Sequence, residues 1–169
     1  MKMNNLKDLY IEQLRDLYSA ESQLIEAIPL MAKAATHPEL RQAFEKHLEQ
    51  TKKQREDVGK IVNALGAKPD GHTCEAMKGL IKEASELLAK KTQVDADVMD
   101  AGLIAAAQRV EHYEIAGYGT VCAYAKMLGE TDAHNTLHRI AGEEGDTDKT
   151  LTSLAMSVIN MDAMQSAAD

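Results

Sequence analysis

The sequence predicts an all-α protein that folds as a four-helix bundle, with a short crossover helix between the second and third long helices. Its composition, rich in Ala, Glu, Leu and Lys with no Trp and one Phe, favours helix over strand. Four long stretches repeat apolar residues at steps of three and four, and a shorter helical stretch separates them into two pairs. With 169 residues and 44% hydrophobic side chains, the chain suits a single domain over residues 1–169.

The first two long helices are predicted at residues 4–35 and 38–65, each with one apolar stripe. Pro29 predicts a kink or an interruption in the first helix, because its ring removes a hydrogen-bond donor and crowds the preceding turn. The sequence THPE between the two stretches predicts the start of the second helix, with Thr36 or His37 available as its cap.

The sequence GAKPDGHT at 66–73 combines Gly, Pro and Asp and predicts a loop. The crossover helix is predicted at 74–90, and the remaining long helices at 95–128 and 132–160. Gly129 supplies a stop for the third long helix. Two long helices, a short crossover and two further long helices are the order of a ferritin-like bundle.

The charge and the cysteines exclude several classes of protein. A formal net charge of −8 disfavours binding to nucleic acid or to an anionic membrane surface, since both reward clustered Lys and Arg. No apolar run approaches the roughly 18–20 residues of a membrane span, and the first residues lack the pattern of a signal peptide. Cys74 and Cys122 match no disulfide framework or zinc pattern, so we interpret them as reduced thiols. We expect a soluble, cytoplasmic protein.

Acidic residues lie on the faces of three long helices that are predicted to be buried. Glu21 falls within the apolar stripe of the first helix, and Glu111 and Glu114 lie on the inner face of the third. Glu144 occupies the inner face of the fourth, with Asp148 one turn further on. These acids cannot all ionise in an apolar layer without compensation, because unpaired buried charge is costly.

The second long helix contributes His47 at the centre of its apolar face, and no inward acid. Glu21 lies about 15 residues before the turn that joins the first two helices, and His47 about 11 after it. Glu114 and Glu144 are each about 15 residues from the turn between the last two helices. Antiparallel neighbours face each other at equal distances from their turn, so these side chains can share one layer of the bundle.

A cation resolves the conflict between these charges. Carboxylates with an imidazole suit iron or manganese, and facing acids inside bundles form di-iron and di-manganese sites. We therefore predict a dinuclear site of iron or manganese. The predicted metal ligands are Glu21, His47, Glu111, Glu114, Glu144 and Asp148. The alternative is that some of the acids are rim residues paired with Lys or Arg, and that His47 is a hydrogen-bonded interior histidine.

The chain also resembles a known bacterial family in four segments: LYSAESQL at 17–24, HLEQT at 47–51, AAAQRVEHYEIAGYG at 105–119 and EEGDTD at 143–148. These segments are similar to the YciF-type stress proteins, and the similarity spans nearly the whole chain. The resemblance implies a ferritin-like four-helix bundle, a homodimer, and a site similar to the di-iron site of rubrerythrin-type proteins. It implies no particular activity.

The second helix departs from the rubrerythrin-type pattern. Where that pattern has Glu-x-x-His, this chain has EQTK at 49–52, and Glu49 points away from the apolar stripe. Either His47 or Glu49 completes the site on this helix, or the site is incomplete there. Asp148 stands near the position at which a histidine is expected on the fourth helix.

Two functions from different classes fit these observations. The first is a metal-binding protein with oxidase or peroxide-handling activity. The second is a noncatalytic stress protein that acts through a helical interface with another protein, and incomplete ligation on the second helix favours it. A DNA-protecting role is disfavoured by the acidic charge and the lack of a basic tail.

Overall fold

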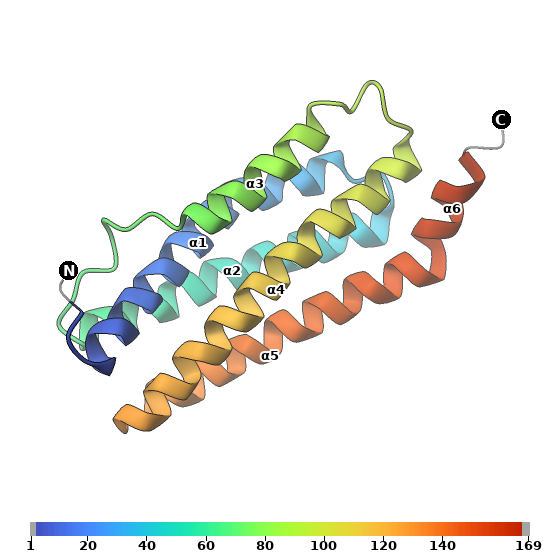
Figure 1. The fold of residues 1–169 in the computed structure, drawn as a ribbon. Helices are drawn as coiled ribbons and strands as arrows, with labels where there is room; N and C mark the ends of the chain where they lie inside the picture. Colours follow the sequence, from blue (N-terminus) through green and yellow to red (C-terminus); the bar gives the residue numbers. More distant parts are fainter. Residues whose placement is uncertain (1–2, 167–169) are drawn as a thin grey trace.

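The computed structural model describes residues 3–166, and its elements are all helical (Figure 1). In chain order they are α1 (Leu6–Ala34), α2 (Pro38–Ala64), α3 (Glu75–Leu88), α4 (Ala96–Leu128), α5 (Thr131–Leu154), a π-helical turn η1 (Ala155–Ile159) and α6 (Asn160–Gln165). No strand occurs between residues 3 and 166, so the all-α prediction is confirmed. Within the same range, no helix is both long enough and apolar enough to cross a membrane.

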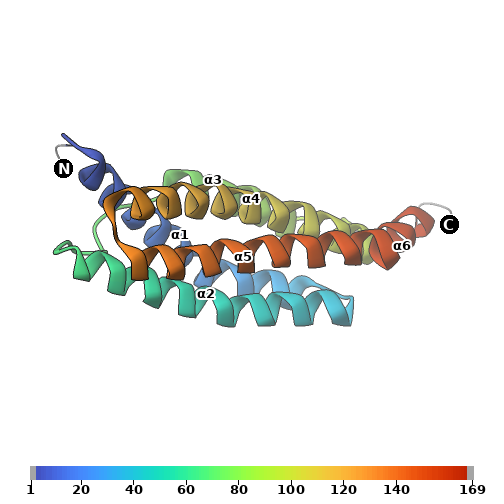
Figure 2. The same ribbon diagram turned by 90° about the horizontal axis from the view of Figure 1, so that it is seen from below.

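The four long helices form a bundle of two antiparallel pairs (Figures 1 and 2). α1 packs along α2 and α4 packs along α5, while α1 also contacts α4 and α2 contacts α5. α3 lies against α1 and α4 and carries the chain back to the end of the bundle at which α4 begins. This long connection makes α1 and α5 run in one direction and α2 and α4 in the other. The predicted bundle with one crossover helix is therefore confirmed.

Pro29 lies inside α1, which continues to Ala34, so the predicted interruption is absent. A proline in a helix removes one backbone hydrogen bond, which weakens the last turns of α1. The neighbouring Ile28 and Met31 are buried in the core. Packing of these side chains holds the helix together where its own hydrogen bonds are fewer.

The C-terminal part of the chain differs most from the helix predicted at 132–160. α5 ends at Leu154, and the chain continues through the π turn η1 into α6. A π turn holds one residue more than an α turn, so it rotates the residues that follow about the helix axis. Ile159 is buried as a result, and α6 packs against α4. Periodicity at 3.6 residues does not reveal such a turn.

Side chains and one glycine define the ends of several helices. Asn5 accepts a hydrogen bond from the amide of Asp8 at the start of α1, and the thiol of Cys74 accepts one from Met77 at the start of α3. Gly129 ends α4 with a φ of 75°, a left-handed conformation that favours glycine, as predicted.

The start of α2 is capped from another helix. His37 is its N-cap residue, but the His37 side chain makes no capping hydrogen bond. Instead, the buried carboxylate of Asp100 in α4 accepts hydrogen bonds from the amides of Thr36 (2.9 Å) and His37 (2.7 Å). The hydroxyl of Thr36 also donates to Asp100, at 2.7 Å. The predicted position of the cap is therefore confirmed at His37, but the hydrogen-bond acceptor comes from a residue distant in sequence.

A layer of polar side chains divides the apolar core into two clusters. One cluster includes Ile28 and Leu103, and the other includes Leu14 and Val121. The buried polar residues are Glu21, His47, Thr51, Gln54, Asp100, Glu111, Glu114 and Glu144. All of them except Asp100 fall, along their own helix, between a residue of one cluster and a residue of the other. The polar layer therefore crosses the middle of the bundle.

Candidate metal centre

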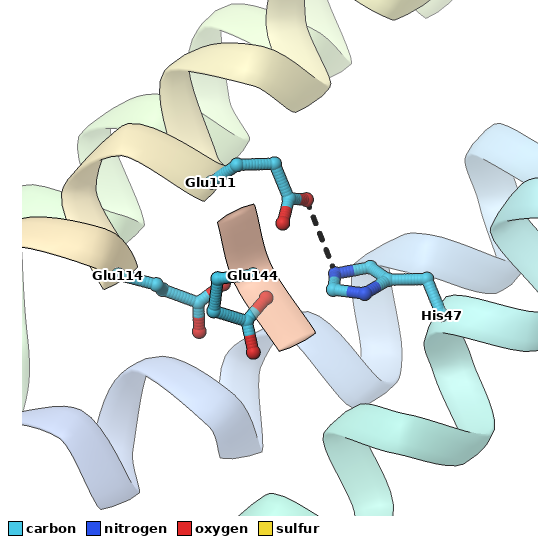
Figure 3. A group of neighbouring side chains, drawn as sticks. All are labelled: His47, Glu111, Glu114 and Glu144. Carbon is cyan, nitrogen blue, oxygen red and sulfur yellow. Dashed lines mark ion pairs between the residues drawn. The ribbon is translucent and has the colours of Figure 1, made fainter. Parts of the chain in front are cut away.

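Four buried side chains from three helices meet in the polar layer (Figure 3). His47 comes from α2, Glu111 and Glu114 from α4, and Glu144 from α5. One ligand atom from each residue lies within 4.8 Å of those of the other three. These residues are between 0% and 4% exposed. Three carboxylates and one imidazole are thus available to a common point inside the protein.

The sequence of α4 explains why two acids point inward from one helix. Glu111 and Glu114 are three residues apart and so lie on one face, one turn from each other. Val110 and Tyr118 on either side of them are buried in the two apolar clusters. Burial of these apolar neighbours fixes the rotation of α4, and the rotation carries both carboxylates inward.

His47 is the one nitrogen ligand of the group. Its Nε2 lies 3.2 Å from Oε1 of Glu111, the contact dashed in Figure 3. Neither ring nitrogen makes a well-aligned hydrogen bond within residues 3–166. Burial lowers the pKa of His47 to about 4, so the ring is neutral at neutral pH. A neutral imidazole offers a nitrogen lone pair to a metal ion but no positive charge to the acids.

Glu21 of α1 lies beside the four residues and belongs to the same electrostatic group. It is fully buried, and its Oε1 accepts a hydrogen bond from the hydroxyl of Tyr118. Its Oε2 has no partner in the described part of the chain. Burial, and then the charge of Glu144, raise the pKa of Glu21 well above its ordinary value. Glu21 therefore keeps one oxygen free beside the cluster.

The four carboxylates of this layer lack basic partners. Among the described residues, no Lys or Arg forms an ion pair with any of them. The one contact of ion-pair length joins Glu111 to His47, whose ring is neutral. Six of their oxygens have no hydrogen-bond donor: Glu21 Oε2, Glu111 Oε2, and both oxygens of Glu114 and of Glu144. Each buried polar atom left unpaired costs about 1–3 kcal/mol. The alternative in which lysine or arginine neutralises these acids is therefore not observed.

Burial is the first cause of the pKa shifts in this layer, and like charges add to it. Burial raises the pKa of Glu144 to about 7, and the charge of Glu143 acts in the same direction. The pKa values of Glu111 and Glu114 are raised well above the ordinary range by burial and by the neighbouring acids. At neutral pH the layer cannot hold four ionised carboxylates without added positive charge.

Protons can supply that charge when no cation is present. Burial and the neighbouring acids raise the pKa values of Glu21, Glu111 and Glu114 well above the ordinary range, which favours their protonated forms. A proton on a carboxylate removes its negative charge from the layer.

The donor set fits a divalent metal ion. Carboxylate oxygens and a neutral imidazole are the ligands that iron and manganese take in proteins. The oxygens without partners in residues 3–166 lie inside the layer, where no donor of the chain satisfies them. Glu111, Glu114, Glu144 and His47 converge on one another, as Figure 3 shows. A bound cation would replace both the protons and the missing donors.

Two of the residues considered from the sequence lie away from the cluster. Asp148 accepts a hydrogen bond from Gln108 at 2.9 Å, and its Oδ1 lies 3.5 Å from Nε2 of the exposed His112. Glu49 is exposed and pairs with Lys52 at 2.6 Å. Of the two candidates on α2, His47 is the one that the helix places in the layer.

Gln54 is a buried polar residue of the layer that the sequence pattern did not single out. It lies seven residues after His47 on α2, close to two full turns, and therefore on the same face of the helix. Its side-chain amide donates to Oε2 of Glu143 at 3.0 Å. The spacing from His47 to Gln54 and on to the buried Val58 was a signal that could have found it.

The whole chain is similar to a known bacterial sequence. Protein YciF of Escherichia coli strain K12 is 43% identical over 168 residues, which are 99% of this chain and 100% of YciF. The crystal structure of the E. coli stress protein YciF matches with a TM-score of 0.87, covering 94% of this chain and 99% of that one.

Two further solved structures share this architecture. YcfI of Rhodopseudomonas palustris is 41% identical, with a TM-score of 0.84 over 90% of this chain and 96% of that one. A protein of Xanthomonas campestris is 20% identical, with a TM-score of 0.74 over 95% of this chain and 99% of that one, and shows the same fold.

The family is established by a match that covers nearly all of the described helices. Residues 5–164 match the family described as Domain of unknown function (DUF892). Together with the identity to YciF, this match confirms the resemblance to YciF-type proteins seen in the sequence. The chain therefore belongs to this family, the Domain of unknown function (DUF892) proteins.

Proposed function

We propose that this protein is a ferritin-like stress-response protein that binds iron or manganese inside its helical bundle. The proposed ligands are His47, Glu111, Glu114 and Glu144, with the free oxygen of Glu21 beside them. One observation carries the proposal: four buried carboxylates share a layer with a neutral imidazole and, among the described residues, no Lys or Arg pairs with them. The stress role rests on similarity to the E. coli stress protein YciF.

The charge of the layer supports two ions rather than one. Four ionised carboxylates carry four negative charges, and the neutral His47 adds none. Two divalent cations balance that charge, whereas a single one balances only two of the four carboxylates and leaves the other two to be neutralised by protons. Facing acids in four-helix bundles bind pairs of iron or manganese ions in the same manner.

Oxidase or peroxide-handling activity is the enzymatic form of this proposal. Bound iron would supply electrons for the reduction of dioxygen or peroxide. Glu111 and Glu114 would help to hold the ion, and their negative charges would offset its positive charge. Tyr118 orients Glu21 through its hydroxyl, and the surrounding apolar clusters limit the access of water.

Metal analysis of the full chain tests the proposal. Protein loaded anaerobically with Fe(II) and desalted should retain about two ions per chain. Glu111→Gln and Glu144→Gln should lose most of that metal, while the exposed Glu49→Gln should keep it. Wild-type protein that emerges metal-free would contradict metal binding, and absence of oxygen uptake by metal-loaded protein would contradict the oxidase form alone.

A noncatalytic role through protein–protein contact is the second candidate. A cavity of about 470 Å³ opens between α1, α3 and α4, lined by apolar residues that include Leu24, Met31 and Ile81. At its edge, Leu30 is 57% exposed. Exposed apolar surface of this kind is typical of an interface, and we propose a second copy of the chain as the partner. Sedimentation should then show a dimer that Leu30→Glu dissociates, and an unchanged dimer would exclude this surface.

The proposed location is the cytoplasm. Cys74 and Cys122 are both free and buried. Unpaired thiols persist in a reducing compartment, where disulfides are rare. The protein can be taken directly from cells, unfolded without added reductant and treated with a thiol-specific label. We expect both Cys74 and Cys122 to react.

A further inference from the structure

A small opening between α2 and α5 leads from the surface to the candidate metal centre. It has a volume of about 60 Å³, and His47 and Glu111 are part of its wall. The share of liquid volume of one water molecule is about 30 Å³, so the opening holds about two waters or a partly dehydrated ion. The larger cavity between α1, α3 and α4 includes none of the proposed ligands in its wall.

The inner end of the opening presents ligand atoms that have no partner within residues 3–166. His47 is 4% exposed, and both of its ring nitrogens lack hydrogen-bond partners. Oε2 of Glu111 is likewise buried and unpartnered. The opening thus ends on two of the groups proposed to bind metal.

The outer part of the opening is polar. Its wall includes the carboxylates of Glu143 and Asp146, the side chains of Gln50 and Thr147, and one basic residue, Lys46. Asp146 and Lys46 are exposed, and Lys149 outside the wall pairs with Asp146 at 3.1 Å, while Glu143 is half-buried between the surface and the cluster. Carboxylates along a path attract cations and raise the rate at which they arrive.

Glu143 is held against the wall by two partners. Its Oε1 accepts a hydrogen bond from Arg139 at 2.6 Å, and its Oε2 accepts one from Gln54 at 3.0 Å. Arg139 is in turn held by Asp57 at 2.7 Å. These contacts place the Glu143 carboxylate beside the path between solvent and the cluster without making it part of the cluster.

We propose that divalent cations reach the buried centre through this opening, and that Glu143 is the residue that receives them from solvent. The inference rests on the proposed metal binding and adds a route to it. The Glu143 carboxylate replaces part of the hydration of the ion at half depth, and His47 and Glu111 take the ion over at the inner end. Lys46 at the mouth opposes the approach of the cation.

Stopped-flow loading of the metal-free full chain with Co(II), followed by its visible absorption, tests the route. Glu143→Gln and Asp146→Asn should each slow loading about three- to tenfold, and Lys46→Gln should accelerate it, because single charges near a binding path change association rates. Glu83→Gln on α3 removes the same charge away from the opening and should load at the wild-type rate. The differences should shrink as ionic strength rises.

The amount of Co(II) bound at equilibrium separates the route from the site. The route is supported if all variants bind the wild-type amount of Co(II) and differ only in rate as described. It is overturned if the wild type binds Co(II) and the four variants load at one rate. If the wild type binds no Co(II), the proposed metal binding fails first, and the route fails with it. Asp146→Asn lies on the surface and keeps the test valid if Glu143→Gln perturbs α5.

Discussion

Each acid of the polar layer can remain buried in two forms, as a protonated acid or as a metal ligand. Burial raises the pKa of Glu144 to about 7, so near neutral pH this group is divided between its two forms. The pKa values of Glu111 and Glu114 are also raised well above the ordinary range, by burial and by the neighbouring acids. Metal binding and proton release are therefore linked at the level of single residues.

Loading the metal-free protein with Mn(II) at pH 6.5 should release protons, because Glu144, with a pKa of about 7, is mostly protonated at this pH and must lose its proton to bind a cation. A pH indicator in weakly buffered solution measures the release. Glu144→Gln should release fewer protons, and the exposed Glu49→Gln should match the wild type. Binding of Mn(II) without proton release would show that the acids are already ionised in the metal-free protein.

The sequence predicted the inward acids because each of them occupies a position in a row of apolar residues that repeat at steps of three and four. Glu21 and Glu144, for example, each stand between apolar residues that the structure buries. Asp148 lies one turn beyond Glu144, and spacing alone places it on the same face. In the structure its carboxylate instead accepts a hydrogen bond from Gln108 and lies close to His112, both on α4. Contacts of this kind depend on the relative rotation of two helices, which a single-helix pattern does not contain.

At the scale of the helices, Asp100 joins the turn between α1 and α2 to the start of α4. Its carboxylate is 1% exposed and accepts hydrogen bonds from two backbone amides and from the hydroxyl of Thr36. The two amides belong to Thr36 and His37, which precede α2, and the helix itself offers them no hydrogen-bond acceptor. One buried side chain therefore satisfies a helix end and fixes the position of three helices.

Asp100→Ala should destabilise the protein by about 1–3 kcal/mol, because it leaves the backbone amides of Thr36 and His37 without their acceptor. Urea unfolding followed by circular dichroism measures the change. Thr36→Val removes only the hydroxyl donor and should cost about 1 kcal/mol. An Asp100→Ala protein as stable as the wild type would show that water replaces the carboxylate at this turn.

The sequence predicted which elements exist better than it predicted how they begin and end. Long apolar stripes indicated every long helix, and Gly129 correctly marked the end of α4. The acceptor at the start of α2 was missed because Asp100 is distant in sequence from Thr36 and His37. The π turn η1 was missed because the apolar periodicity of an α-helix does not show where one extra residue enters a turn.

At the scale of the whole molecule, the buried acids make stability depend on pH. The pKa of Glu144 is about 7 in the folded state, raised by burial above its ordinary value of 4.5. Its contribution to stability is present below pH 4.5 and is lost as pH rises through 7, and the other raised acids act in the same direction. Burial lowers the pKa of His47 to about 4, so this group acts in the opposite direction, but only below pH 6.5.

The metal-free protein should therefore lose about 1 kcal/mol of stability or more between pH 6.5 and pH 8, since Glu144, with a pKa of about 7, loses its proton over this range. Urea unfolding in the presence of a chelator measures this loss. Protein loaded with Mn(II) should show the reverse slope, because the metal binds ionised carboxylates more tightly as pH rises. A flat profile in the chelated protein would mean that the acids do not titrate in this range.

The polar layer that crosses the bundle also bears on how the protein moves. Because the layer separates two apolar clusters, the side-chain packing of one half of the bundle does not extend directly into the other. The two halves are connected by the backbones of α1, α2, α4 and α5. Repulsion within the layer would let each half open on its own, as partly independent units of local unfolding. A pair of ions held from three or four helices would join the halves into one cooperative unit, so occupancy of the centre would set the internal mobility of the molecule.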